Sequence, residues 1–326
     1  MAKYSFETTA DVVAADYSAA IKSKVILITG VSPGGLGAQF ALTIAKHSPG
    51  LLILAGRNID KIQQTASLIK ESVSSVPTRA LKLDLNSLAQ VREAAKIVNG
   101  YQEQIDILVN NAGIMAPPYT LSEDGIESQF ATNHIGHFLF TNLIINKLIS
   151  ISDGRVSRVI NVSSDGHRLS PVRFADWNFD NGKNYNPWIA YGQTKTANML
   201  FSKSLAAKLG PKGLISVSLH PGVIPTTNVV RFVPDGGWDG LIKLDHQQGN
   251  RKAWGGFNFK TLEQGAATHV YASFDDLIST KHNNGAYLED SRIFKPEEVP
   301  SWGRDEVEAE KLWKLSEQIV GQQFEY

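Results

Sequence analysis

The chain has 326 residues with 32 basic and 32 acidic side chains, so its formal net charge is zero, and 42% of its residues are hydrophobic. This composition is typical of globular proteins, and the balanced charge removes the electrostatic basis for a nucleic-acid or anionic-membrane partner. Because the chain has no cysteine, disulfides, thiolate nucleophiles and cysteine-ligated metals are excluded.

Short β-branched runs alternate with longer segments of helical spacing. Such alternation predicts βαβ units, and strands that read as continuous apolar runs indicate helices on both faces of the sheet. The predicted fold class is therefore α/β, a doubly wound, mostly parallel sheet of Rossmann type in a single domain. The predicted strands are 24–29, 51–55, 79–83, 105–109, 156–162 and 213–219, and the predicted helices include 38–46, 59–73, 88–98 and 189–209.

The first predicted strand leads into a glycine-rich turn at residues 29–37, which a helix follows. Glycines there permit a tight turn, close approach of the backbone to a pyrophosphate and close helix–strand packing, and the helix N-terminus offers free N–H groups. A glycine cluster alone could be a plain loop, but its position between strand and helix predicts a dinucleotide site. The predicted contacts are Gly30, Ser32, Gly35, Leu36 and Gly37.

The end of the second predicted strand indicates which dinucleotide binds. NAD enzymes usually place a carboxylate there, whereas an arginine accommodates the 2′-phosphate of NADP. The sequence has no acid at this position but has Arg57, about 20 residues past the turn. The sequence therefore favours NADP(H) over NAD(H), and the missing acid also weakens a methyltransferase interpretation. The alternative is a surface arginine paired with Asp60.

Two long segments interrupt the alternation, at 165–188 and 228–260. Both are rich in aromatic residues, which argues against disorder, and loops of this length are commonly functional. We expect them to form a lid and an apolar pocket over the nicotinamide; alternatively, they cover a bare edge of the sheet. Residues 1–23 and 289–326 are predicted N- and C-terminal extensions. The latter contains a helix with Leu312, Leu315 and Ile319 on one face.

Tyr191 and Lys195 are four residues apart in a predicted helix, so they share one face. A phenol has an ordinary pKa of about 10, and a neighbouring ammonium favours the phenolate and lowers that pKa. This pairing predicts a tyrosine that exchanges a proton with a carbonyl/alcohol pair. Alone, the four-residue spacing has little specificity.

Seven motifs occur in the order that the short-chain dehydrogenase/reductase family shows, and the chain resembles that family over roughly residues 24–287. Within it, the chain is most similar to NADP-dependent retinol dehydrogenase and WW-domain oxidoreductase-like members, because of its long 164–191 segment and its tail at 309–313. The motifs are the turn 29–37, Asp84-Leu85, Asn110-Asn111-Ala112-Gly113, Asn133, Ser163-Ser164, Tyr191 with Lys195, and Pro221-Gly222 with Thr226.

The resemblance implies the catalytic roles. Tyr191 would be the acid/base, and Lys195 would lower its pKa and bind the nicotinamide ribose. Ser164, rather than Ser163, would orient the substrate carbonyl, and Asn133 would hold a water in a proton relay. From the residues alone, the serine pair could instead cap the next segment, and Asn133 could satisfy buried backbone.

The resemblance also implies the remaining cofactor contacts. Asp84 and Leu85 would meet adenine, Asn111, Ala112 and Gly113 the adenosine side, and Pro221, Gly222, Val223 and Thr226 the nicotinamide amide. The asparagine motif could otherwise be a turn, and Pro221-Gly222 could simply end a strand.

The glycine turn departs from the family pattern by one extra residue. Aligning Gly35 and Gly37 with the family leaves four residues after Gly30 instead of three; alternatively, Gly30 and Gly34 match and the insertion follows them. The turn has no basic residue, so Arg57 is expected to provide most of the phosphate recognition.

No metal site is expected. His134 and His137 have a helical spacing that could bind a metal, but no nearby acid completes a ligand set, so packing or hydrogen bonding is favoured. No apolar run reaches the roughly 20 residues of a membrane span, and no secretory signal is evident, so we expect a cytoplasmic protein without a membrane span.

The sequence thus predicts an NADP(H)-dependent oxidoreductase that transfers hydride between nicotinamide and a carbonyl or alcohol, with a bulky apolar small molecule as substrate. The alternatives are a non-catalytic nucleotide-binding regulator and an epimerase or dehydratase of the same fold. Pairing into a homodimer or homotetramer through the helices that carry Asn133 and Tyr191 is implied by the resemblance. Neither the substrate's identity nor the physiological direction follows from these residues.

Overall fold

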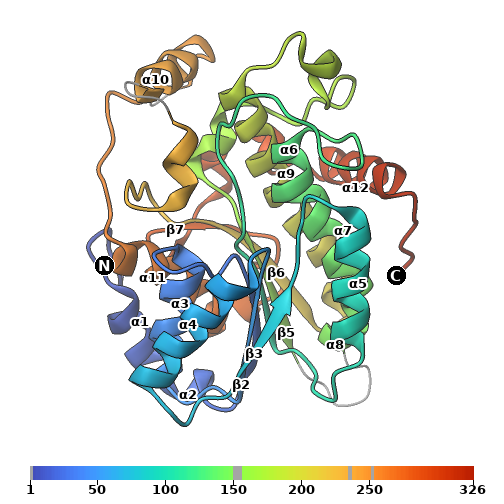
Figure 1. Ribbon diagram of the computed structural model, residues 1–326. Coiled ribbons are helices and arrows are strands. Elements are labelled where there is room, and N and C mark those ends of the chain that lie inside the picture. Colours follow the sequence, from blue (N-terminus) through green and yellow to red (C-terminus); the bar gives the residue numbers. More distant parts are fainter. Residues whose placement is uncertain (1–2, 150–155, 234–236, 251–252) are drawn as a thin grey trace.

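A single eight-stranded sheet forms the centre of the molecule in the computed structural model, which describes residues 3–149, 156–233, 237–250 and 253–326 (Figure 1). The strand order is β3-β2-β1-β4-β5-β6-β7-β8, and every neighbouring pair is parallel except β7 and β8. The α/β prediction is confirmed. The strands are β1 Val25–Thr29, β2 Leu51–Gly56, β3 Thr78–Lys82, β4 Ile107–Asn110, β5 Ser157–Val162, β6 Leu214–His220, β7 Tyr287–Glu289 and β8 Arg292–Ile293.

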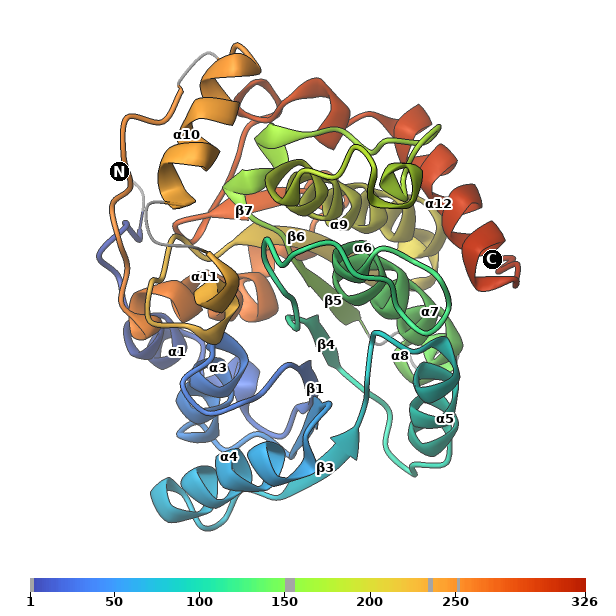
Figure 2. The same cartoon turned by 45° about the horizontal axis from the view of Figure 1, so that its top comes forward.

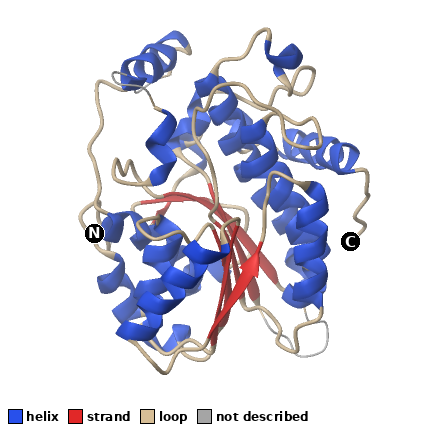
Figure 3. Ribbon diagram, viewed as in Figure 1, coloured by secondary structure: helices blue, strands red, loops and turns tan. Residues whose placement is uncertain are grey.

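Helices cover both faces of the sheet, as Figure 3 shows, and each face has its own apolar core. One face is covered by α1 (Ala10–Asp16), α3 (Leu36–Ala45), α4 (Ile59–Ser72) and α11 (Leu262–Phe274). The other face is covered by α5 (Leu88–Asn99), α7 (Gly136–Leu143), α9 (Pro187–Leu209) and α12 (Glu306–Val320). The shorter helices are α2 (Ser18–Ile21), α6 (Ser128–Phe130) and α8 (Ile145–Leu148).

Helix starts differ from the predicted bounds because of capping. Helix α3 begins at Leu36 rather than Ala38, since the extended Gly35 is its N-cap. Helix α9 begins at Pro187, because the Asn186 side chain accepts hydrogen bonds from the N–H groups of residues 188 and 189 and proline suits the first helical position.

Both predicted extensions are part of the packed structure. The segment 1–23 contains α1 and α2, and α1 packs against α11. The segment 289–326 begins at the end of β7, pairs β8 with β7 and continues into α12. In α12, Leu312 is fully buried, but Leu315 and Ile319 lie only at the margin; Trp313 and Ser316 are buried instead.

The segments expected to bind a dinucleotide follow the carboxyl ends of the parallel strands. Strands β2 and β3 follow β1 on one side of it in the sheet, whereas β4 lies on the other side of β1. This reversal of direction creates the crevice in which doubly wound folds bind ligands.

The two aromatic-rich segments differ from each other. The segment 165–188 contains two short 3₁₀ turns, Asp165–Leu169 and Phe179–Gly182, before α9. The segment 228–260 is not a plain loop, because it contains a 3₁₀ turn at Asn228–Phe232 and helix α10 (Gly237–Gln247). Figure 2 shows α10 at the edge of the molecule, and the helix packs against the 3₁₀ turn Asp165–Leu169.

Candidate active site

A cavity of about 590 Å³ lies at the carboxyl edge of the sheet and extends from the glycine turn to α10. Its polar end is lined by the segments after β1, β2, β3 and β4, and its apolar end by residues of the 228–260 segment. The predicted site residues that line it are Gly30, Ser32, Gly35, Leu36, Arg57, Asp84, Leu85, Asn111, Ala112, Gly113, Ser164, Tyr191, Lys195, Pro221, Gly222 and Val223.

The conformation of the glycine turn indicates where its extra residue lies relative to the family pattern. Gly30 has a φ of +75° and touches Ala112, so that an added Cβ would lie 2.7 Å from the Ala112 Cα. Gly37 is the residue that lets α3 pack on β1, because its Cβ would lie 2.7 Å from the Gly30 carbonyl oxygen. Gly35 precedes the helix as its N-cap. The extra residue therefore falls between Gly30 and Gly35.

The asparagine motif after β4 braces this turn. The Asn111 side chain donates to the carbonyl oxygens of Thr29 (2.8 Å) and Gly30 (3.2 Å). The Thr29 hydroxyl in turn accepts from the N–H groups of Asn111 and Ala112, both at 3.0 Å. These contacts leave the strand ends β1 and β4 fixed beside each other, and the cavity opens above them.

Arg57 is exposed at the mouth of the cavity, directly after β2. Within the described residues, no carboxylate forms an ion pair with it, so the alternative pairing with Asp60 is not formed. Asn58, the N-cap of α4, and Lys61, in the first turn of that helix, also line the cavity. Sequence reasoning missed Lys61, although its position one turn after Arg57 could have indicated it.

Ser164, Tyr191 and Lys195 gather at the centre of the cavity. The Ser164 hydroxyl accepts from the Gly166 N–H at 3.0 Å and faces the Tyr191 phenol. The Lys195 ammonium lies 5.4 Å from the centroid of the Tyr191 ring and donates to the Val162 carbonyl oxygen at 3.0 Å. Ser163 does not face the phenol, because its hydroxyl donates to the Lys195 carbonyl oxygen.

The pKa of Tyr191 differs from the expectation of a lowered value. Burial disfavours the phenolate and raises its pKa to about 12, and the hydrogen bond with Ser164 only partly opposes this rise. Burial also lowers the pKa of Lys195 to about 8. Desolvation is the largest cause of both shifts, and it disfavours both charged forms.

Asn133 lies next to the cavity but does not line it. It occupies a π-helical turn, Ala131–Ile135, between α6 and α7, a distortion common at functional sites. Its side chain accepts from the Ile114 N–H (2.8 Å) and donates to the Ile114 carbonyl oxygen (2.9 Å) and the Thr194 hydroxyl (3.0 Å). These bonds satisfy buried backbone, which was the alternative interpretation of this residue.

Two further predicted contacts lie outside the lining. Gly37 packs beneath the turn rather than facing the cavity. Thr226 is exposed, and Thr227 lines the cavity in its place, with its hydroxyl bonded to the Ile224 carbonyl oxygen. The tight turn after Ile224 directs the second threonine inward, which the sequence alone does not show.

Aromatic residues of the 228–260 segment form the apolar end. Trp238, Trp254 and Phe257 line the cavity together with Met115 and Leu241. The aromatic residues of the 165–188 segment do not line it, which corrects the expectation of a pocket built from both segments. Trp177 packs against Phe130, Phe179 and Tyr185 pack against each other, and Trp188 stacks on Trp238 from behind.

The two histidines beside Asn133 make hydrogen bonds in the protein interior. His134 contacts the Ser316 hydroxyl at 2.8 Å, and His137 contacts the Thr29 hydroxyl at 2.9 Å. Burial lowers the pKa of His137 to about 4, so its imidazole is neutral at pH 7. Across the described residues, no three potential His or carboxylate ligands gather into a metal site, and no helix is both long and apolar enough to cross a membrane.

Comparisons with known proteins agree with this geometry. A family model described as short chain dehydrogenase matches residues 24–176. Retinol dehydrogenase 13 of Mus musculus is 35% identical over 93% of this chain and 85% of its own length. The chloroplastic short-chain dehydrogenase TIC 32 A of Brassica napus is 35% identical over 92% of this chain and 89% of its own. A crystal structure of an uncharacterised protein from Mycobacterium paratuberculosis matches with a TM-score of 0.69 and 30% identity, covering 95% of this chain and 98% of that one.

The fold and the cavity are those of a dinucleotide-dependent oxidoreductase. The chain belongs to the short-chain dehydrogenase/reductase family. Two solved structures of the same fold, each 20% identical to this chain, contain NADP and NADH respectively.

Proposed function

We propose that the protein is an NADP(H)-dependent oxidoreductase that interconverts a bulky, apolar carbonyl compound and its alcohol. The observation that carries this proposal is the convergence of Ser164, Tyr191 and Lys195 at the middle of one cavity. A braced glycine turn lies at one end of this cavity and an apolar, aromatic wall at the other. A binding-only protein would have no use for a buried phenol beside a buried amine.

The polar end fits a nicotinamide dinucleotide. Gly30 and Gly37 keep the turn tight, because an added Cβ would lie 2.7 Å from the Ala112 Cα or from the Gly30 carbonyl oxygen, and Gly35 and Leu36 at the start of α3 line the cavity where the pyrophosphate would bind. The N-terminus of α3 provides free N–H groups toward it. When bound, the cofactor supplies or accepts the hydride.

The chain's own residues handle the proton. In the reductive direction, Tyr191 donates its phenolic proton to the carbonyl oxygen, and its high pKa keeps that proton in place until the oxygen becomes basic. Ser164 holds the same oxygen by a hydrogen bond. The Lys195 ammonium stabilises the phenolate that remains. In the oxidative direction, the phenolate takes the proton back.

The first test is Tyr191→Phe, which removes only the transferable proton. We expect NADPH-dependent reduction of carbonyl compounds to fall at least about 100-fold, as for loss of a general acid, while NADPH binding measured by fluorescence is retained. Tyr271→Phe, on a buried tyrosine of α11 that does not line the cavity, is the matched control and should keep full activity. Near-full activity of Tyr191→Phe would refute the proposal.

The same experiment separates the alternatives. A nucleotide-binding regulator would bind NADPH but consume none with any carbonyl compound. An epimerase or dehydratase would convert its substrate without net NADPH consumption. Only a reductase oxidises one NADPH for each carbonyl reduced.

Preference for NADP(H) is tested at Arg57. A guanidinium can form bidentate, charge-assisted hydrogen bonds to a 2′-phosphate, worth about 1.5–3 kcal/mol or roughly 10–100-fold in affinity. Arg57→Ala should raise the KM for NADPH by about that factor and leave the KM for NADH nearly unchanged. Lys70→Ala, at the far end of α4, is the control. Equal increases in the KM for NADPH and for NADH would show that Arg57 does not recognise the 2′-phosphate.

A further inference from the structure

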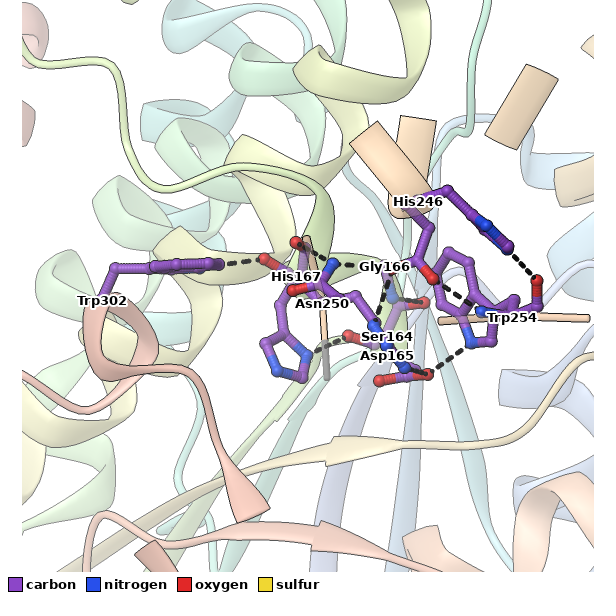
Figure 4. Close-up of polar contacts among 10 residues, drawn as sticks. Ser164, Asp165, Gly166, His167, His246, Asn250, Trp254 and Trp302 are labelled. Carbon is purple, nitrogen blue, oxygen red and sulfur yellow. Dashed lines mark hydrogen bonds and ion pairs between the residues drawn. The ribbon is translucent and has the colours of Figure 1, made fainter. Parts of the chain in front are cut away.

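Trp254, in the apolar wall of the cavity, is fixed at four points, and Figure 4 shows its contacts with Asp165 and His246. Its indole N–H donates to the Asp165 carboxylate at 2.9 Å, and its backbone N–H donates to the Asp245 carboxylate at 2.7 Å. Its carbonyl oxygen contacts the His246 ring at 2.7 Å, and the Arg168 guanidinium lies 4.7 Å from its ring centroid. A surface aromatic residue would not need so many polar anchors.

Asp245 is a fully buried carboxylate near the end of α10. It forms an ion pair with the Arg168 guanidinium at 2.9 Å and accepts hydrogen bonds from the Asn250 side chain and the Trp254 backbone, both at 2.7 Å. The Asn250 side chain also donates to the Arg168 carbonyl oxygen at 3.1 Å. Because a buried charge is tolerated only when it is fully paired, these bonds hold the end of α10 in one position.

Arg168 connects this anchor to the segment that carries Ser164. Its guanidinium also reaches the Asp165 carboxylate at 3.4 Å, and Asp165 directly follows Ser164. That turn is itself held rigidly, because the His167 carbonyl oxygen accepts from the Thr196 hydroxyl (3.0 Å) and the Trp302 indole (3.2 Å). The wall of the apolar end is therefore built on the same turn as the carbonyl-orienting serine.

We propose that Trp254 determines substrate specificity, and that Asp165, Arg168 and Asp245 are positioning residues that hold its ring as the wall of the substrate cavity. The substrate class is an apolar carbonyl compound or alcohol long enough to reach from Ser164 to this ring. The three charged side chains of this array bind one another and Trp254. The inference rests on the proposed function, which it makes more specific.

The test compares NADPH-dependent reduction of propanal, a short aldehyde, with that of decanal, which has a much longer apolar chain. In Trp254→Ala and in Asp245→Asn, kcat/KM for decanal should fall at least tenfold, mainly through a higher KM. The loss for propanal should be much smaller, so that the decanal/propanal ratio falls. Asp239→Asn, on an exposed acid of the same helix, is the matched control and should leave the ratio unchanged.

Trp254→Phe provides a second route if Asp245→Asn fails to fold, as judged by thermal unfolding and NADPH binding. It keeps a ring but removes the donor to Asp165, so the decanal/propanal ratio should fall by less than in Trp254→Ala. If the decanal/propanal ratio were unchanged in both Trp254 variants, the inference would be wrong. The proposed function would still stand in that case, because the wild-type protein would turn over both aldehydes. Equal losses for the two aldehydes in Asp245→Asn would also overturn it, because they would show a merely structural role. Absence of any wild-type NADPH consumption would instead refute the proposed function.

Discussion

Burial controls the chemistry of the two central side chains. The sequence spacing correctly predicts that Tyr191 and Lys195 lie one helical turn apart on one face. It does not predict that both would be almost fully enclosed, because enclosure is produced by elements distant in sequence, including the turn after β5. The result is a phenol with a pKa raised to about 12 and an amine with a pKa lowered to about 8. The phenol is therefore held in its proton-donating form.

These pKa values predict how reduction depends on pH. Tyr191 stays protonated throughout the range from pH 6 to 10, whereas Lys195 loses its charge above pH 8. We expect kcat/KM for reduction to be constant up to about pH 8 and then to fall, because the neutral amine cannot stabilise the phenolate. The free energy of unfolding should instead rise as the pH increases from 8 toward the ordinary pKa of lysine. The buried charge of Lys195 destabilises the folded state, and this charge is lost above pH 8.

A pH–rate profile with propanal as substrate checks this expectation. Lys195→Arg, whose guanidinium stays charged, should move the alkaline decline beyond pH 10 if the variant retains activity. A wild-type profile that is flat to pH 10 would contradict the assignment of the decline to Lys195.

Among the elements, those with strong periodicity are the ones that the sequence predicts. The six long strands read as apolar runs, and the structure places each within two residues of its predicted bounds. Strands β7 and β8 were missed, because three and two residues are too short to show an alternation. Helix α10 was missed because its glycines and its position in a long segment indicated a loop. The π-helical turn at Asn133 has no local sequence signal.

Helix α12 is a tertiary element whose packing can be tested directly. Trp313 is buried and contacts the Phe138 ring of α7 (5.0 Å between centroids) and the Phe201 ring of α9 (6.1 Å). Trp313→Ala should lower the free energy of unfolding by about 3–5 kcal/mol, the usual cost of removing a buried tryptophan. Val307→Ala, at a side chain of the same helix that is 64% exposed, should change it by about 0.5 kcal/mol or less.

Urea unfolding measures both free energies, and activity in the absence of urea should be retained in both variants. If Trp313→Ala cost no more than Val307→Ala, α12 would not be part of the cooperative core. The predicted apolar face of this helix was only partly correct, because the helix packs between two others and buries Trp313 and Ser316 in addition to Leu312.

At the scale of the whole molecule, the cofactor end of the site was predictable and the substrate end was not. The cofactor contacts follow strand ends, and parallel strands bring their carboxyl ends to one edge regardless of the loops. Trp254, by contrast, contacts Asp165, which is 89 positions away in the chain, and no pattern in the sequence connects the two. The expected cytoplasmic location stays a prediction.

The position of α12 has a consequence for self-association. The sequence resemblance implied that subunits would pair through the helices carrying Asn133 and Tyr191, but in each chain α12 already lies against α7 and α9. Lys208 of α9 is joined to Glu310, and the Ser204 hydroxyl to the Ala309 carbonyl oxygen. Helix α12 therefore occupies part of the surface of these helices, and pairing of two copies there, which stays a prediction, would have to use the part that α12 leaves uncovered.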